Sequence, residues 1–66
     1  MINPSILKLV LGKTERDAGL LLDQYNCIWR VKFRDGVIVT NLSADRDDRR
    51  YNLILENGKV VRVVAG

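Results

Sequence analysis

The chain has 66 residues, of which 47% are hydrophobic and 29% charged, and its formal net charge is +3. This length and balance predict one globular domain over residues 1–66 and argue against a disordered chain. With no histidine and only Cys27, an intrachain disulfide is excluded and a zinc site of the usual ligands is not expected. The cysteine content favours a reducing, cytoplasmic location, and no apolar run is long enough to predict a signal peptide or a membrane span.

The N-terminal third predicts an apolar segment followed by a helix. Ile6–Leu11 is expected to form a short strand or an irregular apolar arm that Gly12 ends. Thr14 is a good helix N-cap, and the acidic residues after it suit the positive end of the helix macrodipole. Asn26 can end this helix in a left-handed conformation. The stripe expected to face the core, at helical spacing, consists of Ala18, Leu21, Leu22 and Tyr25.

The rest of the chain predicts strands. Residues 28–34 alternate between an apolar face (Trp29, Val31, Phe33) and a basic face (Arg30, Lys32, Arg34). A turn or bulge is expected at Asp35–Gly36, and Asn57–Gly58 is the strongest hairpin signal. In the last run, Val61 and Val63 are expected on one face and Val60, Arg62 and Val64 on the other. The sum is an α+β fold, with a single helix packed on a small mixed sheet.

The most informative stretch is the polar segment between two of these strands. Val37–Val39 is apolar, and the chain is apolar again at Tyr51, Leu53, Ile54 and Leu55. Residues 40–50 between them form a polar, charged segment that ends in the unbroken charged run Asp45–Arg50. Charged side chains cannot enter a core unpaired, so this segment predicts a long exposed loop. A long ordered loop in so short a chain is expected to be functional. Arg50 and Asn52 alternate on the strand that leaves the loop, so both can point back under it.

The residue types argue for binding rather than catalysis. The aspartates lie in a solvated loop beside arginines, Cys27 has no histidine to activate it, and the glycines form no phosphate-binding motif. We therefore expect no enzyme activity, no cofactor and no metal, and a protein as the partner. The weak, dispersed basic bias argues against nucleic acid as a partner, and homo-oligomers through an exposed strand edge stay open.

Short motifs resemble the potato inhibitor I family of serine protease inhibitors, and especially its small bacterial relatives. The similar segments are Gly12-Lys13-Thr14 at the helix entry, Val39-Thr40 before the loop, Arg50-Tyr51-Asn52-Leu53 after it, and Asn57 to Val63 with a final Gly66. The resemblance implies a protease-binding loop at Thr40, Asn41, Leu42 and Ser43. Asn41, or Leu42 after a one-residue shift, would be the specificity residue. Arg50, Asn52 and Gly66 would support the loop.

Two further hypotheses use the same residues differently. In the first, the scaffold is a non-inhibitory, cytoplasmic protein-interaction module of a bacterium or phage. Its contact surface is then the charged insert of Asp45, Arg46, Asp47, Asp48, Arg49 and Arg50. In the second, the basic strand face and the loop arginines bind an anion, a nucleotide or a nucleic acid, and binding then weakens steeply with salt.

Overall fold

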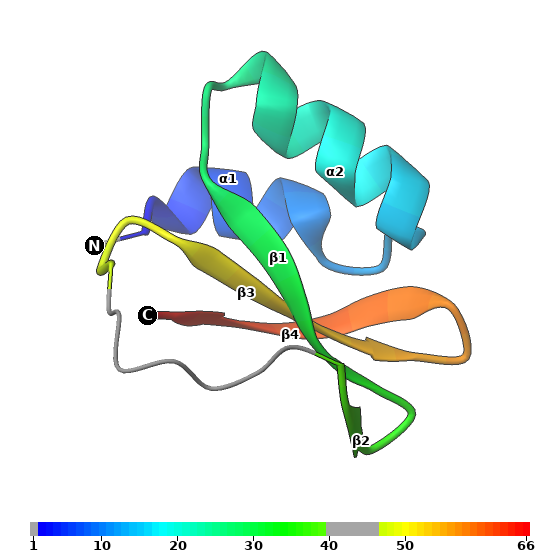
Figure 1. Cartoon of the computed structure of the whole chain (residues 1–66). Coiled ribbons are helices and arrows are strands. Elements are labelled where there is room, and N and C mark those ends of the chain that lie inside the picture. Colours follow the sequence, from blue (N-terminus) through cyan, green and yellow to red (C-terminus); the bar gives the residue numbers. More distant parts are fainter. Residues whose placement is uncertain (1, 40–46) are drawn as a thin grey trace.

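The computed structural model describes residues 2–39 and 47–66, and these form two helices and a mixed sheet (Figure 1). The helices are α1 (Pro4–Val10) and α2 (Glu15–Gln24). The strands are β1 (Trp29–Arg34), β2 (Val37–Ile38), β3 (Tyr51–Glu56) and β4 (Lys59–Ala65), in the order β2-β1-β3-β4. The β1–β3 pair is parallel, and the other two pairs are antiparallel. The α+β class and the mixed sheet are as predicted, but the fold has two helices rather than one.

Helix α1 corrects the prediction of a strand or irregular arm at Ile6–Leu11. Asn3 is the N-cap, because its side chain accepts a hydrogen bond from the Ser5 N–H at 2.8 Å, and Pro4 occupies the first turn. A capping asparagine followed by proline is a helix start signal. The apolar run concealed it, because a short run broken only by Lys8 fits a strand as well as a helix.

Helix α2 begins and ends where the sequence predicts. The Thr14 side chain accepts the Asp17 N–H at 3.2 Å, and Asn26 adopts a positive φ of 57° just after the helix. Ala18 and Leu22 are fully buried, as predicted. Tyr25 is wrong as a core residue, because it is 50% exposed at the C-cap, where the helix has already ended.

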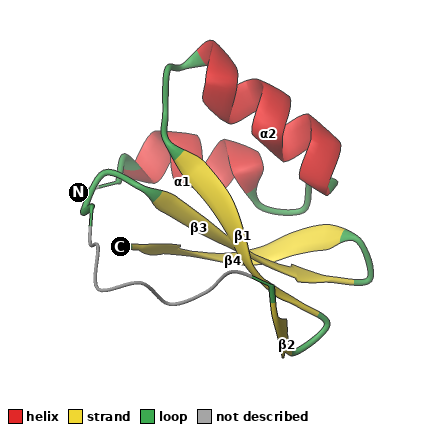
Figure 2. Cartoon of the chain, in the orientation of Figure 1, coloured by secondary structure: helices red, strands yellow, loops and turns green. Residues whose placement is uncertain are grey.

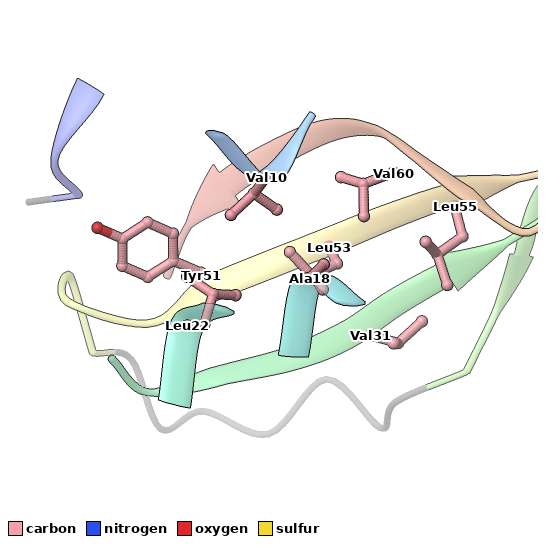
Figure 3. Close-up of a cluster of buried hydrophobic side chains, with 8 residues drawn as sticks. All are labelled: Val10, Ala18, Leu22, Val31, Tyr51, Leu53, Leu55 and Val60. Carbon is pink, nitrogen blue, oxygen red and sulfur yellow. The ribbon is translucent and has the colours of Figure 1, made fainter. Parts of the chain in front are cut away.

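One apolar layer lies between the helices and the sheet (Figures 2 and 3). Both helices lie on the same face of the sheet, and α1 and α2 contribute buried side chains to the same cluster as three strands. The cluster consists of Val10, Ala18, Leu22, Val31, Tyr51, Leu53, Leu55 and Val60. Among the described residues, no helix covers the opposite face, which we call the open face.

Two bulges change which side chains share a face. In β1, Val31 is paired with Leu53 but Phe33 with Ile54, so the register slips between them. Phe33 therefore shares the open face with Ile54 instead of joining the core. The prediction that placed Phe33 with Trp29 and Val31 is wrong, because one extra residue moves every later side chain to the other face.

The second bulge corrects the faces of the last strand. Val60 pairs with Leu55 and Arg62 with Ile54, which leaves Val61 without an opposite residue. Val60 is consequently a core residue, whereas Val61 is 49% exposed. Both predicted turns are present. Asp35–Gly36 and Asn57–Gly58 have positive φ at both residues, as two-residue hairpin turns require.

Candidate functional site

The predicted binding loop lies only partly within the described residues. Thr40, Asn41, Leu42, Ser43, Asp45 and Arg46 fall outside them. The loop continues with Asp47, Asp48 and Arg49, which the structure places immediately before β3. The candidate site therefore consists of the two described ends of the segment and the strands between which it runs.

Each end of the segment is fixed by hydrogen bonds. At the upstream end, the Val39 N–H donates to the Lys32 carbonyl of β1 at 2.9 Å. At the downstream end, the Arg50 N–H donates to the Asp47 carbonyl at 2.9 Å, which closes a turn. The Asp47 carboxylate also accepts the Arg49 N–H at 2.9 Å. Backbone anchors thus hold the chain on both sides of residues 40–46.

Asp47 and Arg49 form an ion pair in the downstream turn. Arg49 Nε lies 3.2 Å from Asp47 Oδ1, and the Arg49 side chain is 77% exposed. The hydrogen bond from the Arg49 side chain is the main reason why the pKa of Asp47 lies below its usual range, and the Arg49 N–H adds to the effect. Asp48 is exposed beside this pair. The turn presents a fixed pattern of opposite charges to solvent.

A buried amide lies near the downstream end of this segment, two residues after Arg50. Asn52, on the open face of β3, is 2% exposed and is the buried polar residue of the described chain. Its Oδ1 accepts a hydrogen bond from Arg30 Nε at 2.5 Å. Its Nδ2 donates to the main-chain oxygens of Val64 at 3.0 Å and Gly66 at 3.1 Å. One side chain therefore connects β1, β3 and the end of the chain after β4.

The three residues predicted to support the loop are brought together at this point. Asn52 contacts Gly66 directly, and the Gly66 N–H donates to the Arg50 carbonyl at 3.3 Å. Arg30 completes the network, although the alternation of residues 28–34 predicts it only as part of a basic strand face. The signal for Arg30 is the parallel register, because Arg30 is paired with Asn52 across β1 and β3. That register cannot be read from either strand alone. The supporting role itself stays a prediction.

The predicted basic face on β1 is not continuous. Arg30 is engaged with Asn52, and the Lys32 ammonium lies 5.9 Å from the centre of the Phe33 ring. The bulge turns Arg34 toward the helices, where its guanidinium forms an ion pair with Glu15 of α2. The three cations therefore do not form the single stripe that an extended polyanion would need.

A small hollow of about 210 Å³ opens next to the downstream turn. Its lining residues are Asn3, Asn26, Cys27, Ile28, Arg49 and Tyr51. The Tyr51 hydroxyl accepts the Asn3 N–H at 2.9 Å, and burial raises the pKa of this hydroxyl. Cys27 is half-buried and its thiol donates to the Tyr25 carbonyl at 3.7 Å. The Asn3–Tyr51 bond attaches the start of α1 to the same end of the sheet as the candidate site.

No family model, curated protein or solved structure matches the chain. None of the helices in residues 2–39 and 47–66 is long and apolar enough to span a membrane. Over the same residues, histidine, cysteine, aspartate and glutamate side chains form no group of three or more that could hold a metal ion.

Proposed function

We propose that this chain is a small, non-enzymatic binding protein that presents the segment between β2 and β3 to a protein partner, in the manner of a substrate-like serine protease inhibitor. The observation that carries the proposal is the network around Asn52. Three elements converge on one buried amide next to the downstream end of the segment. Buried polar networks of this kind fix one arrangement of the strands that share them.

Topology adds support to the proposal. Because β1 and β3 are parallel neighbours, the connection between them starts at one end of the strand pair and ends at the other. The β2 hairpin uses only part of that connection, and Val39 and Asp47 bound the remainder. Anchored ends reduce the conformational entropy that the segment loses on binding. A substrate-like inhibitor depends on this property.

The contact residues come from the resemblance to the potato inhibitor I family. In this proposal, Thr40 precedes the specificity residue, Asn41 enters the specificity pocket of the protease, and Leu42 follows it. A one-residue shift puts Leu42 in the pocket instead. The choice between the two decides the class of protease, since an amide and an aliphatic side chain suit different pockets.

The test is a titration of a panel of serine proteases with the purified chain. We expect tight competitive inhibition of at least one protease, and a large loss of inhibition in either Asn41→Ala or Leu42→Ala. Glu56→Ala is the matched control, because Glu56 is exposed at the opposite end of β3 from the segment. If every protease cleaves the segment as an ordinary substrate, the inhibitor proposal fails.

A second candidate function is a non-inhibitory interaction module in the cytoplasm, and the ordered charge pair Asp47–Arg49 favours it. Asp48 and Arg49 are exposed, the Asp47 side chain is 23% exposed, and all three lie on a hydrogen-bonded turn. Charges arranged in this way steer association, so the association rate should fall as salt is added. Affinity capture with the Asp47→Ala, Arg49→Ala double variant tests this function. Capture of the same partners at unchanged rates would contradict it.

A further inference from the structure

The two edges of the sheet differ in how they are protected. At the β4 edge, Val60 is paired on its outer side: its N–H donates to the Lys13 carbonyl at 2.8 Å, and its carbonyl accepts the Gly12 N–H at 2.8 Å. The same strand carries a bulge and the charged Arg62. Backbone cover, bulges and charges are the features by which proteins prevent an edge strand from pairing with another chain.

The β2 edge has none of these features. Its three consecutive residues Val37, Ile38 and Val39 are 66%, 53% and 50% exposed. They include no charge and no proline, and the β1–β2 register is regular. Within the described residues no strand pairs with the outer side of β2, and Figure 1 shows β2 far from both helices. An exposed apolar edge of this kind is a template for strand pairing.

The backbone direction of this edge follows from one hydrogen bond. The Val39 N–H donates to Lys32 of β1, so the backbone of Val39 points inward. Backbone direction alternates along an antiparallel strand. The N–H and the carbonyl of Ile38 therefore point away from the sheet. Ile38 is the centre of the free edge, with one β-branched valine on each side.

We propose that β2 pairs with β2 of a second copy of this chain, antiparallel and about a two-fold axis at Ile38. The segment Val37–Ile38–Val39 has the same residue types in both directions. Antiparallel pairing about Ile38 places Ile38 opposite Ile38 of the second copy, and Val37 opposite Val39. The two isoleucines then exchange both backbone hydrogen bonds. This self-complementarity selects a second copy over an unrelated strand.

In the proposed dimer, the open face of one copy is continuous with the open face of the other across the two-fold axis. Ile38 is paired with Phe33, and Phe33 with Ile54. These three side chains form an apolar row across the open face, and the two-fold axis joins it to the same row of the second copy. Cross-strand pairs of aromatic and β-branched residues stabilise sheets. The contact is still smaller than a standard interface, so we expect a dissociation constant on the order of 100 µM.

The salt dependence of the affinity distinguishes this dimer from an association driven by opposite charges. Each copy carries a formal net charge of +3, so two copies repel each other. Screening weakens that repulsion, and added salt should therefore strengthen the dimer. A complex with an oppositely charged partner responds in the other direction. The dimer does not depend on protease inhibition, because its contacts lie in β2 and Val39 and not in residues 40–46.

The experiment is sedimentation of the full chain from about 10 µM to about 1 mM, a range that brackets the expected dissociation constant. Ile38→Lys puts a charge at the proposed axis, twice per dimer. Val61→Lys is the matched control, since Val61 has a similar exposure (49% against 53% for Ile38) on the opposite edge strand. A two-dimensional amide spectrum of each variant establishes that it is folded.

We expect the wild-type chain and Val61→Lys to dimerise alike, and Ile38→Lys to raise the dissociation constant by about 100-fold. In a mixture of isotope-labelled and unlabelled wild-type chains, filtered NOEs should connect Val37 to Val39 of the second copy. A monomeric wild-type chain at the highest concentration overturns the proposal. So does a folded Ile38→Lys that associates like wild type. If Ile38→Lys is unfolded, the NOEs decide, and intermolecular NOEs that avoid β2 overturn the proposal.

Discussion

Replacement of Asn52 by alanine tests whether the buried amide holds the candidate site together. The substitution removes one hydrogen bond from a charged donor, Arg30, and two to the main-chain oxygens of Val64 and Gly66. Such bonds contribute about 1.5–3 kcal/mol for a charged group and about 0.5–1.5 kcal/mol for a neutral one. Water can reach the half-buried guanidinium in the variant, so we take the lower part of the summed range. The expected loss in the free energy of unfolding is about 3 kcal/mol.

That loss is large for this chain. Domains have a stability of about 0.05–0.15 kcal/mol per residue, which gives roughly 3–10 kcal/mol for 66 residues. We therefore expect Asn52→Ala to lower the melting temperature by roughly 12–24 °C, or to leave the chain unfolded. Urea unfolding followed by the fluorescence of Trp29, the single tryptophan, measures the effect.

A double-mutant cycle with Arg30→Met isolates the bond between the two side chains. If the 2.5 Å contact stabilises the fold, the double variant should lose less free energy than the sum of the two single variants, by about 1.5–3 kcal/mol. Ile54→Ala is the control for removal of a side chain from the same face of β3. A loss below about 1 kcal/mol for Asn52→Ala, or strict additivity with Arg30→Met, would refute the reasoning.

Three further predictions concern other contacts. A Cβ at Gly19 would lie 2.5 Å from Trp29 Cζ2, so Gly19→Ala should destabilise the fold by about 1–2 kcal/mol despite the better helix propensity of alanine; a stabilised variant in urea unfolding would contradict this. Burial raises the pKa of Tyr51 in the folded state, so the unfolded chain loses this hydroxyl proton at lower pH than the folded chain. The stability that the neutral Tyr51 hydroxyl contributes is therefore complete below pH ~10 and is lost as the pH rises above it. Tyr51→Phe should lose the Asn3 bond and also weaken this alkaline destabilisation in pH-dependent unfolding. The carboxyl carbon of Asp47 should titrate at lower pH in the wild type than in Arg49→Ala, and equal NMR midpoints would show that the ion pair has no effect.

Local signals in the sequence predict the elements whose chemistry is local. The Thr14 cap and the left-handed Asn26 bound α2, and the Asn57–Gly58 pair forms the β3–β4 turn. The same kind of signal was present for α1 at Asn3-Pro4, where the cap and the proline define the first turn. It was outweighed by an apolar run that fits a strand equally well. The sequence therefore contains the start signal for α1, although the apolar run after it also fits a strand.

The bulges could not have been predicted in this way. Sequence alternation assumes that successive side chains of a strand point to opposite faces of the sheet. One extra residue in a strand reverses the predicted face of every later residue. Neither bulge has a glycine or a proline to mark it in β1 or β4. Each bulge is defined by the pairing with β3, which is remote in sequence from β1. The role of Arg30 is hidden for the same reason, since its partner Asn52 is 22 residues away.

The β1 bulge explains both why the basic face is interrupted and why an apolar row lies on the open face. If β1 were regular, Arg30, Lys32 and Arg34 would share the open face, and Phe33 would point toward the helices. The bulge instead turns Arg34 toward Glu15 and brings Phe33 to the open face beside Ile38. The bulge thus separates Arg34 from the other two cations that a polyanion would bind. It also places Phe33, the aromatic residue of the apolar row, beside the β2 edge. The open face therefore carries an apolar row from Ile38 through Phe33 to Ile54, with Arg62 paired with Ile54 at its end, and Arg30 at the site end is bound to Asn52.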